Sequence, residues 1–273
     1  MNFRLVALDV DGTLTDSRGE IPARVRQAVG RTASRGVSVT LATGRRLRLA
    51  LPVARELGLT APLVTSGGPL VVEQTGRVLY REPLSEEQLR RAVAFLRRRG
   101  LPPVAAAGRG QPPDVFYEEE GHPAQRFFLE RNDGFTRRVA DLTAGEVPDP
   151  VRVFCLGERE AVHRAWRELS DGAFRLVLND DPQGGTAALE IYAPGASKAS
   201  GVRALAAHLG VAREEILAVG NQLNDLELIE FAGWGVAVGN AVAELKERAA
   251  EVTASSDEAG VAVVLEKYLL GGG

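Results

Sequence analysis

The chain has 273 residues, of which 45% are hydrophobic and 25% are charged, and its formal net charge is −3. This balance is ordinary for a soluble globular protein and lacks the basic excess of a nucleic-acid-binding protein. No apolar stretch approaches the roughly 20 residues of a membrane helix, and one cysteine, Cys155, excludes an internal disulfide framework. Because Asp9 and Asp11 interrupt the N-terminal apolar run, no secretory signal is predicted, and we expect a cytoplasmic protein without a membrane partner.

The first 82 residues alternate between strand and helix patterns, which favours a parallel sheet with helices on both faces. Pro52 lies inside the second helix pattern, where a kink or a break is expected. The predicted elements are a strand at 3–8, a helix at 21–36, a strand at 37–44, a helix at 45–58, a strand at 61–68 and a hairpin at 69–82 that turns at Thr75-Gly76.

Residues 83–189 have a different pattern, in which helix and strand signals are separated by loops rich in proline and glycine. We interpret this stretch as a separate α+β domain inserted between two core segments, residues 1–82 and 190–273. Its predicted elements are helices at 84–100 and 159–170 and strands at 115–118, 151–157, 174–179 and 187–193.

The alternating pattern returns in the last part of the chain. The predicted fold class is therefore α/β, with a doubly wound, mostly parallel sheet made from both ends of the chain and the middle inserted as a second domain. The elements predicted in this last part are helices at 197–210, 224–233, 241–251 and 258–270 and strands at 215–221 and 234–240.

Polar residues follow the predicted core strands at their carboxyl ends, where open α/β sheets bind ligands. Asp9 and Asp11 follow the first strand, and two like charges this close require a compensating cation. Lys198, one of only three lysines among 33 basic residues, begins the helix that resumes the core. The other residues at these ends are Gly12, Thr13, Thr43, Gly44, Arg45, Ser66, Gly67, Gly68, Asn221, Asn224 and Asp225.

These residue types fit phosphoryl transfer assisted by Mg²⁺, which binds a few carboxylates together with phosphate oxygens. Asp9 can act as a nucleophile that forms an aspartyl-phosphate, and Asp11 can act as general acid and base. Thr43 offers a hydroxyl, the Gly44 turn offers backbone N–H groups at a helix N-terminus, and Lys198 offers an ammonium for the phosphoryl oxygens.

Each of these motifs also has a plain structural interpretation. An Asp-Gly pair marks a turn, Gly44 can begin a helix, Lys198 can be a solvated helix residue, and Asn224 or Asp225 can cap the next helix. Their joint occurrence, each at a strand end or a helix start, favours a functional site.

The segments DVDGTLTD, LATGR, SKASGVRALAAHLG and GNQLNDLELIEFAGWGVAVGNA resemble, in this order, the four motifs of the haloacid dehalogenase superfamily. They are most similar to its Cof-type sugar-phosphatase-like branch, whose large α/β cap is of type C2B. The resemblance covers both core segments and implies a Rossmann-like core, a cap domain between the second and third motifs, and a Mg²⁺ cofactor.

The resemblance also implies roles for single residues. Asp9 resembles the nucleophile, Asp11 resembles the general acid and base whose backbone carbonyl also reaches the metal, and Asp225 resembles the acid that steadies the metal's waters or the lysine. The implied catalytic residues are Asp9, Asp11, Thr43 and Lys198, the implied phosphate-binding residues are Asp11, Gly12, Thr43, Gly44, Lys198 and Asn224, and the implied metal ligands are Asp9, Asp11, Asn221 and Asp225.

Two positions depart from the pattern of the family. Asn221 stands where relatives usually carry an aspartate, so one anionic ligand is missing and Mg²⁺ is expected to bind more weakly. Gly67 stands where relatives often carry an asparagine, so one polar group near the substrate is missing.

The function that these observations favour is a Mg²⁺-dependent phosphomonoester hydrolase that acts on a small phosphorylated metabolite, such as a sugar phosphate, through an aspartyl-phosphate. One alternative is a phosphate- or metal-binding protein that has lost turnover through Asn221. Another is a phosphoaspartate signalling domain, which has no use for an acid at Asp11 or for a lid. The cap is expected to select the substrate through residues 101–128 and 182–189, in a monomer or a homodimer.

Overall fold

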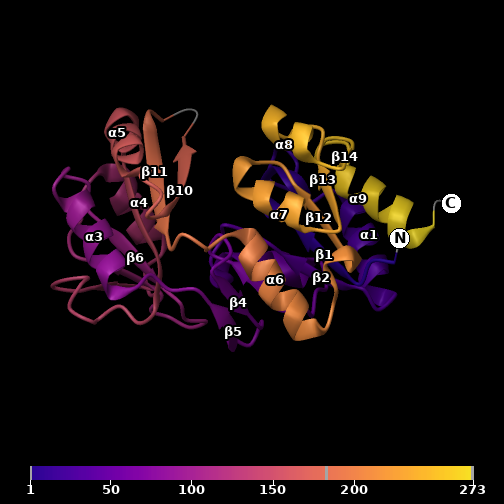
Figure 1. The fold of residues 1–273 in the computed structure, drawn as a ribbon, viewed down its shortest axis with the longest axis horizontal. Helices are drawn as coiled ribbons and strands as arrows, with labels where there is room; N and C mark the ends of the chain where they lie inside the picture. The colour runs from indigo at the N-terminus through magenta and orange to yellow at the C-terminus, as the bar shows by residue number, and fades with distance from the viewer. Residues whose placement is uncertain (1, 182–183, 272–273) are drawn as a thin grey trace. The chain divides into compact units, whose positions relative to one another are not determined.

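The computed structural model describes residues 2–181 and 184–271, and the chain divides into two compact units. The core unit contains residues 1–80 and 197–273, and the inserted unit contains residues 81–196 (Figure 1). No helix in the described ranges is both long and apolar enough to cross a bilayer.

The boundaries of the inserted unit differ from those expected, because residues 81–82 and 190–196 belong to it and not to the core. Strand β11 (Thr186–Tyr192) pairs along its length with β9 (Pro150–Glu158) and β10 (Arg175–Asp180). The chain therefore leaves the inserted unit only after this strand is complete.

In the described residues, the sheet of the core unit has five parallel strands. In sheet order they are β14 (Glu251–Val252), β13 (Trp234–Ala237), β12 (Ile216–Gly220), β1 (Leu5–Leu8) and β2 (Ser38–Leu41). Leu8 pairs with both Val219 and Leu41, so β1, β12 and β2 end side by side. The strands β1 and β12 are fully buried, which explains why their sequences are continuous apolar runs without alternation.

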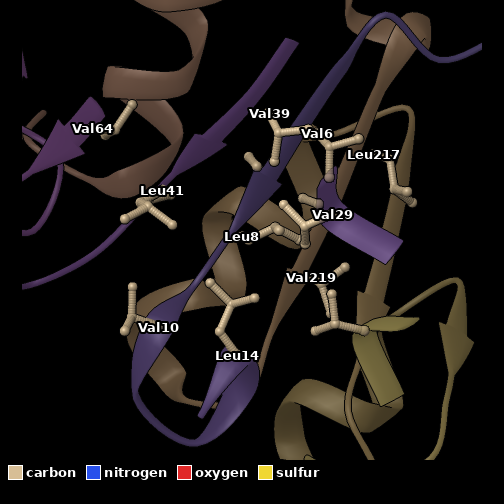
Figure 2. Packing of buried hydrophobic residues seen from close by; sticks show 14 of the residues in the cluster. Val6, Leu8, Val10, Leu14, Val29, Val39, Leu41, Val64, Leu217 and Val219 are labelled. Carbon is tan, nitrogen blue, oxygen red and sulfur yellow. The ribbon is translucent and has the colours of Figure 1, made fainter. Parts of the chain in front are cut away.

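Helices cover both faces of this sheet, because right-handed crossovers that run in opposite directions along a sheet lie on opposite faces. Helix α1 packs with α9, and α6 packs with α7 (Figure 1). Figure 2 shows Val6 and Leu8 of β1 in one buried cluster with Val29 of α1 and Val219 of β12. The helices are α1 (Ala23–Ser34), α2 (Leu47–Glu56), α6 (Lys198–Leu209), α7 (Leu226–Phe231), α8 (Ala243–Arg248) and α9 (Gly260–Leu265), with short helical turns at Val10–Leu14, Arg213–Glu215, Leu223–Asp225 and Glu266–Leu270.

A second, small sheet contains β3 (Leu63–Thr65), β4 (Leu70–Val72) and β5 (Val78–Arg81), and all of it except Arg81 belongs to the core unit. Its link to the large sheet is a parallel bridge between Ala42 and Val64. The expected hairpin is present, and Gly76 takes the positive φ of +90° that its turn requires.

The inserted unit is a sheet with helices packed on it, and it has its own buried cluster of apolar side chains. Cys155 lies in that cluster, and burial raises the pKa of its thiol to about 12, so it is an unreactive core residue. Pro182 and Gln183, which belong to a segment expected to set specificity, are outside the described residues. The strands in sheet order are β10, β11, β9, β6 (Val104–Ala107), β7 (Val115–Tyr117) and β8 (Thr136–Arg138), and the helices are α3 (Glu86–Arg97), α4 (Pro123–Arg131) and α5 (Arg159–Leu169).

Several elements differ from the prediction. Pro52, where a kink or a break was expected, lies inside α2, so the break is absent. The helix expected at 241–251 stops at Arg248, because Glu251 and Val252 pair with β13 as an edge strand. Strands β6 and β8 and helix α4 were not predicted.

Candidate active site

Three charged side chains meet inside the core unit at the carboxyl ends of β1 and β12. The Lys198 ammonium donates hydrogen bonds to Asp9 Oδ1 at 2.7 Å and to Asp225 Oδ1 at 2.6 Å. The exposed fractions of Asp9, Lys198 and Asp225 are 5%, 2% and 0%. A buried lysine is stable in its charged form only beside such partners, so the three residues form one electrostatic unit.

The surroundings of this unit shift two pKa values. Burial alone would lower the pKa of Lys198, but Asp225 and Asp9 raise it above its ordinary range, so the side chain stays an ammonium. Burial raises the pKa of Asp9 to about 6, against the lowering effect of Lys198 and with the raising effect of Asp225. The unit therefore sets two acidic side chains against one ammonium.

Lys198 is placed by the start of α6. Ser197 is the N-cap of this helix: its hydroxyl accepts a hydrogen bond from Ser200 N at 3.2 Å, and Ser200 Oγ accepts one from Ser197 N at 3.0 Å. A cation in the first turn opposes the helix dipole, so the two carboxylates, and not the helix, stabilise Lys198 there. Gly68 lies directly against this turn, because a Cβ at Gly68 would be 1.9 Å from the Ser197 carbonyl oxygen.

Asp225 is held by the backbone as well as by the lysine. Its Oδ2 accepts hydrogen bonds from the N–H groups of Asn221 and Gln222, each at 3.0 Å. Gly220 makes room for it, because a Cβ there would be 2.5 Å from Asp225 Cγ. Asp225 therefore anchors Lys198, which is one of the two roles that the family resemblance implied.

The loop after Asp9 folds back over the site. Thr13 Oγ1 donates to Asp9 Oδ2 at 3.1 Å, and Gly12 takes a positive φ of +75°. Asn240 Nδ2 donates to the Gly12 carbonyl at 2.8 Å, and a Cβ at Gly12 would be 2.5 Å from Asn221 Nδ2. The loop thus brings Gly12 against the Asn221 side chain, and the positive φ at position 12 favours glycine there.

Asp11 is oriented differently from Asp9. Its side chain is 65% exposed and forms a bidentate ion pair with Arg45, with Nη2–Oδ1 at 2.5 Å and Nε–Oδ2 at 3.0 Å. The sequence placed Arg45 at a strand end but gave it no role, because a sequence does not reveal which carboxylate an arginine pairs with.

Thr43 and Gly44 lie where β2 was expected to end, but the helix that follows begins later than predicted. Thr43 is fully buried, and its Oγ1 accepts a hydrogen bond from Arg45 N at 3.1 Å. Arg45 O accepts one from Ser66 N at 2.9 Å, so this segment is tied to the loop after β3 and cannot enter the helix. Helix α2 starts at Leu47, and the Gly44 backbone is therefore part of a turn and not of a helix N-terminus.

Two of the asparagines at the strand ends carry side-chain oxygens that could bind a metal. Among the described residues, no hydrogen-bond partner reaches the buried oxygens Asn221 Oδ1 and Asn224 Oδ1. Asn221 follows β12 and Asp9 follows the neighbouring strand β1, and a free amide oxygen at this edge is a ligand that a hard divalent cation takes. The carboxylates of Asp11 and Asp225 are engaged elsewhere, and within the described ranges no three His, Cys, Asp or Glu side chains are arranged to hold a metal. The fit therefore depends on Asp9 and Asn221.

A hollow of about 650 Å³ adjoins the site at Arg45 and Thr15. Charged side chains on its wall already pair with each other, as Arg18 does with Asp16 and Arg26 with Glu56. The described residues that line it do not include Asp9 or Lys198, so we assign it no chemistry.

The family model of the haloacid dehalogenase-like hydrolases matches residues 6–265 of this chain. The chain belongs to this family. The resemblance to the haloacid dehalogenase superfamily, in its Cof-type branch, is therefore confirmed, as are the α/β fold class with an inserted domain and the expectation of an enzyme.

Relatives and solved structures of haloacid dehalogenase-like hydrolases match almost the whole chain. Stress response protein YhaX of Bacillus subtilis (strain 168) is 30% identical over 98% of this chain and 94% of its own. The 5-amino-6-(5-phospho-D-ribitylamino)uracil phosphatase YitU of the same organism is 29% identical over 97% of each chain. The crystal structure of a haloacid dehalogenase-like hydrolase from Bacteroides thetaiotaomicron superposes with a TM-score of 0.80 at 28% identity, covering 97% of this chain and 99% of that one.

Proposed function

We propose that this protein is a Mg²⁺-dependent phosphomonoester hydrolase that acts on a small phosphorylated metabolite, a sugar phosphate or a similar compound, through an aspartyl-phosphate. The observation that carries the proposal is the buried contact of Lys198 with Asp9 and Asp225 at the strand ends. An ammonium fixed at this point neutralises charge on the nucleophile and on an incoming phosphoryl group together.

The first step forms the aspartyl-phosphate. A carboxylate oxygen of Asp9 attacks phosphorus, and the bond from phosphorus to the ester oxygen breaks. Asp11 enters this step as the protonated carboxylic acid and gives its proton to the departing oxygen. Lys198 holds Asp9 in place, because its ammonium occupies one carboxylate oxygen and leaves the attack to the other, which Thr13 orients.

The second step releases phosphate. Asp11, now ionised, removes a proton from a water molecule that attacks phosphorus, and the bond between phosphorus and the Asp9 oxygen breaks. Free phosphate leaves, and both aspartates return to their starting states.

The remaining site residues hold the phosphoryl group and the metal. Thr43, Gly12, Gly44 and Asn224 are assigned to phosphoryl oxygens, Asn224 through the N–H groups of its side-chain amide, because phosphoryl oxygens accept hydrogen bonds. Asp9 and Asn221, with the backbone carbonyl of Asp11, would hold Mg²⁺, which supplies positive charge against the charge that develops during transfer.

The substrate class is supported by the relative YitU, whose name states a small phosphorylated compound as its substrate. The net charge of −3 gives the chain no excess of basic residues for nucleic-acid binding, which supports a small-molecule substrate. We further propose a cytoplasmic enzyme that is a monomer or a homodimer and binds no membrane.

A second candidate is a phosphate- or metal-binding protein without turnover, which Asn221 favours because it removes one anionic ligand. A chromogenic phosphate ester with Mg²⁺ separates the candidates. The hydrolase turns over many equivalents and stops when the metal is chelated, whereas the binding protein releases no product. Labelling once by acetyl phosphate, without sustained release, would instead indicate a phosphoaspartate signalling domain.

A further inference from the structure

The Asp11 carboxylate has one partner that fixes its orientation. Among residues 2–181 and 184–271, Arg45 is the side chain that bonds to it, through two nearly parallel contacts of 2.5 and 3.0 Å. Since 65% of the Asp11 side chain is exposed, neighbouring atoms do not restrict its rotamer by packing. Without Arg45, the carboxylate would be free to occupy several orientations in water.

Arg45 can fix the orientation of the Asp11 carboxylate because the Arg45 backbone is itself held by hydrogen bonds at its N–H and at its carbonyl group. Arg45 N donates to Thr43 Oγ1 at 3.1 Å, and Arg45 O accepts from Ser66 N at 2.9 Å. Ser66 is 3% exposed and adopts a left-handed φ of +58°, which is uncommon for a residue other than glycine. The guanidinium therefore projects from a rigid turn, and its planar fork fixes the plane of the carboxylate as well as its distance.

We propose that Arg45 is a positioning residue that sets the orientation of Asp11 for proton transfer to the departing oxygen. This inference rests on the proposed function, because it assigns Arg45 to the step in which Asp11 acts as an acid. Arg45 acts through Asp11 and is not required to touch the substrate. Replacement of Arg45 should therefore lower the rate of phosphoryl transfer most for substrates whose leaving group must be protonated.

The test compares Arg45→Gln with wild type on phenyl phosphate and p-nitrophenyl phosphate, in Mg²⁺ buffer. The quantity measured is kcat/KM, which reports the transfer to Asp9. We expect a loss of about 10- to 100-fold on phenyl phosphate, whose leaving group needs a proton, and a loss at least about tenfold smaller on p-nitrophenyl phosphate. Arg45→Lys keeps the positive charge but lacks the planar guanidinium, and its kcat/KM on phenyl phosphate should lie between those of Arg45→Gln and wild type.

The controls separate positioning from other roles. Arg55→Gln changes an exposed arginine of α2, the helix that follows the turn of Arg45, and should leave both rates unchanged. Equal losses on both esters would show that Arg45 contacts the substrate or supports the fold, and unchanged or faster rates would show that it does not position Asp11; each result overturns the inference while wild-type turnover keeps the proposed function. Absence of wild-type turnover on both esters would overturn the proposed function and the inference with it.

Discussion

Lys198 is the residue whose environment explains the site best. It is fully charged, buried, and placed at a helix N-terminus, which are three unfavourable conditions unless specific partners offset them. The partners are Asp9 and Asp225, so two acidic side chains share one ammonium, an arrangement that a bound cation would complete.

Replacing Lys198 with methionine tests this reasoning. The change leaves two buried carboxylates without their ammonium, and we expect a loss of about 3–5 kcal/mol in the free energy of unfolding, measured by urea titration at neutral pH. Lys246→Met, at a half-buried position of α8, should cost less than about 0.5 kcal/mol. A similar small cost for both variants would show that Lys198 is not electrostatically essential.

Asn221 gives a second test at the same scale. Asn221→Asp restores an anionic oxygen where the free amide oxygen now lies, and we expect Mg²⁺ to bind about tenfold more tightly, because one ligand gains a charge. Calorimetric titration with MgCl₂ measures the change. Gln222→Glu adds the same charge at an exposed neighbour and should alter the affinity far less. Equal or weaker binding by Asn221→Asp would remove Asn221 from the metal site.

At the scale of elements, the site depends on the close approach of the loop after β3 to the start of α6. Gly68 has a φ of +121°, and its Cβ position overlaps backbone atoms of Ser197 that cannot rotate away. Gly201, on the next turn of α6, has the same restriction, since its Cβ would be 2.4 Å from Gly68 O. Small residues at this crossing thus allow Lys198 to reach Asp9.

We expect Gly68→Ala to lower the free energy of unfolding by about 2–4 kcal/mol and to reduce turnover at least about tenfold, because the new methyl group displaces the turn that carries Lys198. The matched control is Gly36→Ala. Gly36 also has a positive φ, +81°, but nothing lies within 4 Å of its Cβ position, so only the backbone strain of about 1–2 kcal/mol applies. Equal effects of the two changes on stability and turnover would mean that the crossing at Gly68 is not tight.

The elements that were predicted from sequence are those whose local pattern and tertiary role agree. The strand at 3–8 and the helix at 197–210 are examples, because a buried apolar run and a capped helix each have a direct sequence signal. Strand β6 was missed because Val104–Ala107 is mostly alanine, a weak strand former that only its neighbours β9 and β7 hold in the sheet. Helix α4 was missed because its three large apolar residues, Phe127, Phe128 and Leu129, are consecutive and do not indicate a single buried face.

The residues of the site likewise divide into those with a direct sequence signal and those whose contacts depend on the fold. Asp9, Lys198 and Asp225 could be named in advance, because parallel strands with polar ends predict convergence. The partner of Asp11 could not, since the ion pair with Arg45 depends on the turn that delays the start of α2.

At the scale of the whole molecule, the core unit and the inserted unit each have a buried apolar cluster of their own. The chemistry assigned above lies entirely in the core unit, which both ends of the chain build. We therefore expect that a substitution in the apolar cluster of the inserted unit lowers the stability of that unit and leaves the stability of the core unit unchanged.

Leu189→Ala provides the test, because Leu189 is fully buried in the cluster of the inserted unit. The cavity should cost about 2–5 kcal/mol in that unit. Hydrogen exchange should show faster exchange for amides of β9 and β11 and unchanged protection for β1 and β12. Parallel loss of protection in β1 would indicate that the two units unfold as one.

The most direct test of the central assignment is the turnover of a chromogenic phosphate ester by Asp9→Asn, compared with wild type in the presence of Mg²⁺. The substitution keeps the shape of the side chain but removes the nucleophilic carboxylate that Lys198 holds. We expect wild type to turn over and Asp9→Asn to show a loss of at least about a thousandfold. Substantial turnover by Asp9→Asn would contradict the covalent mechanism.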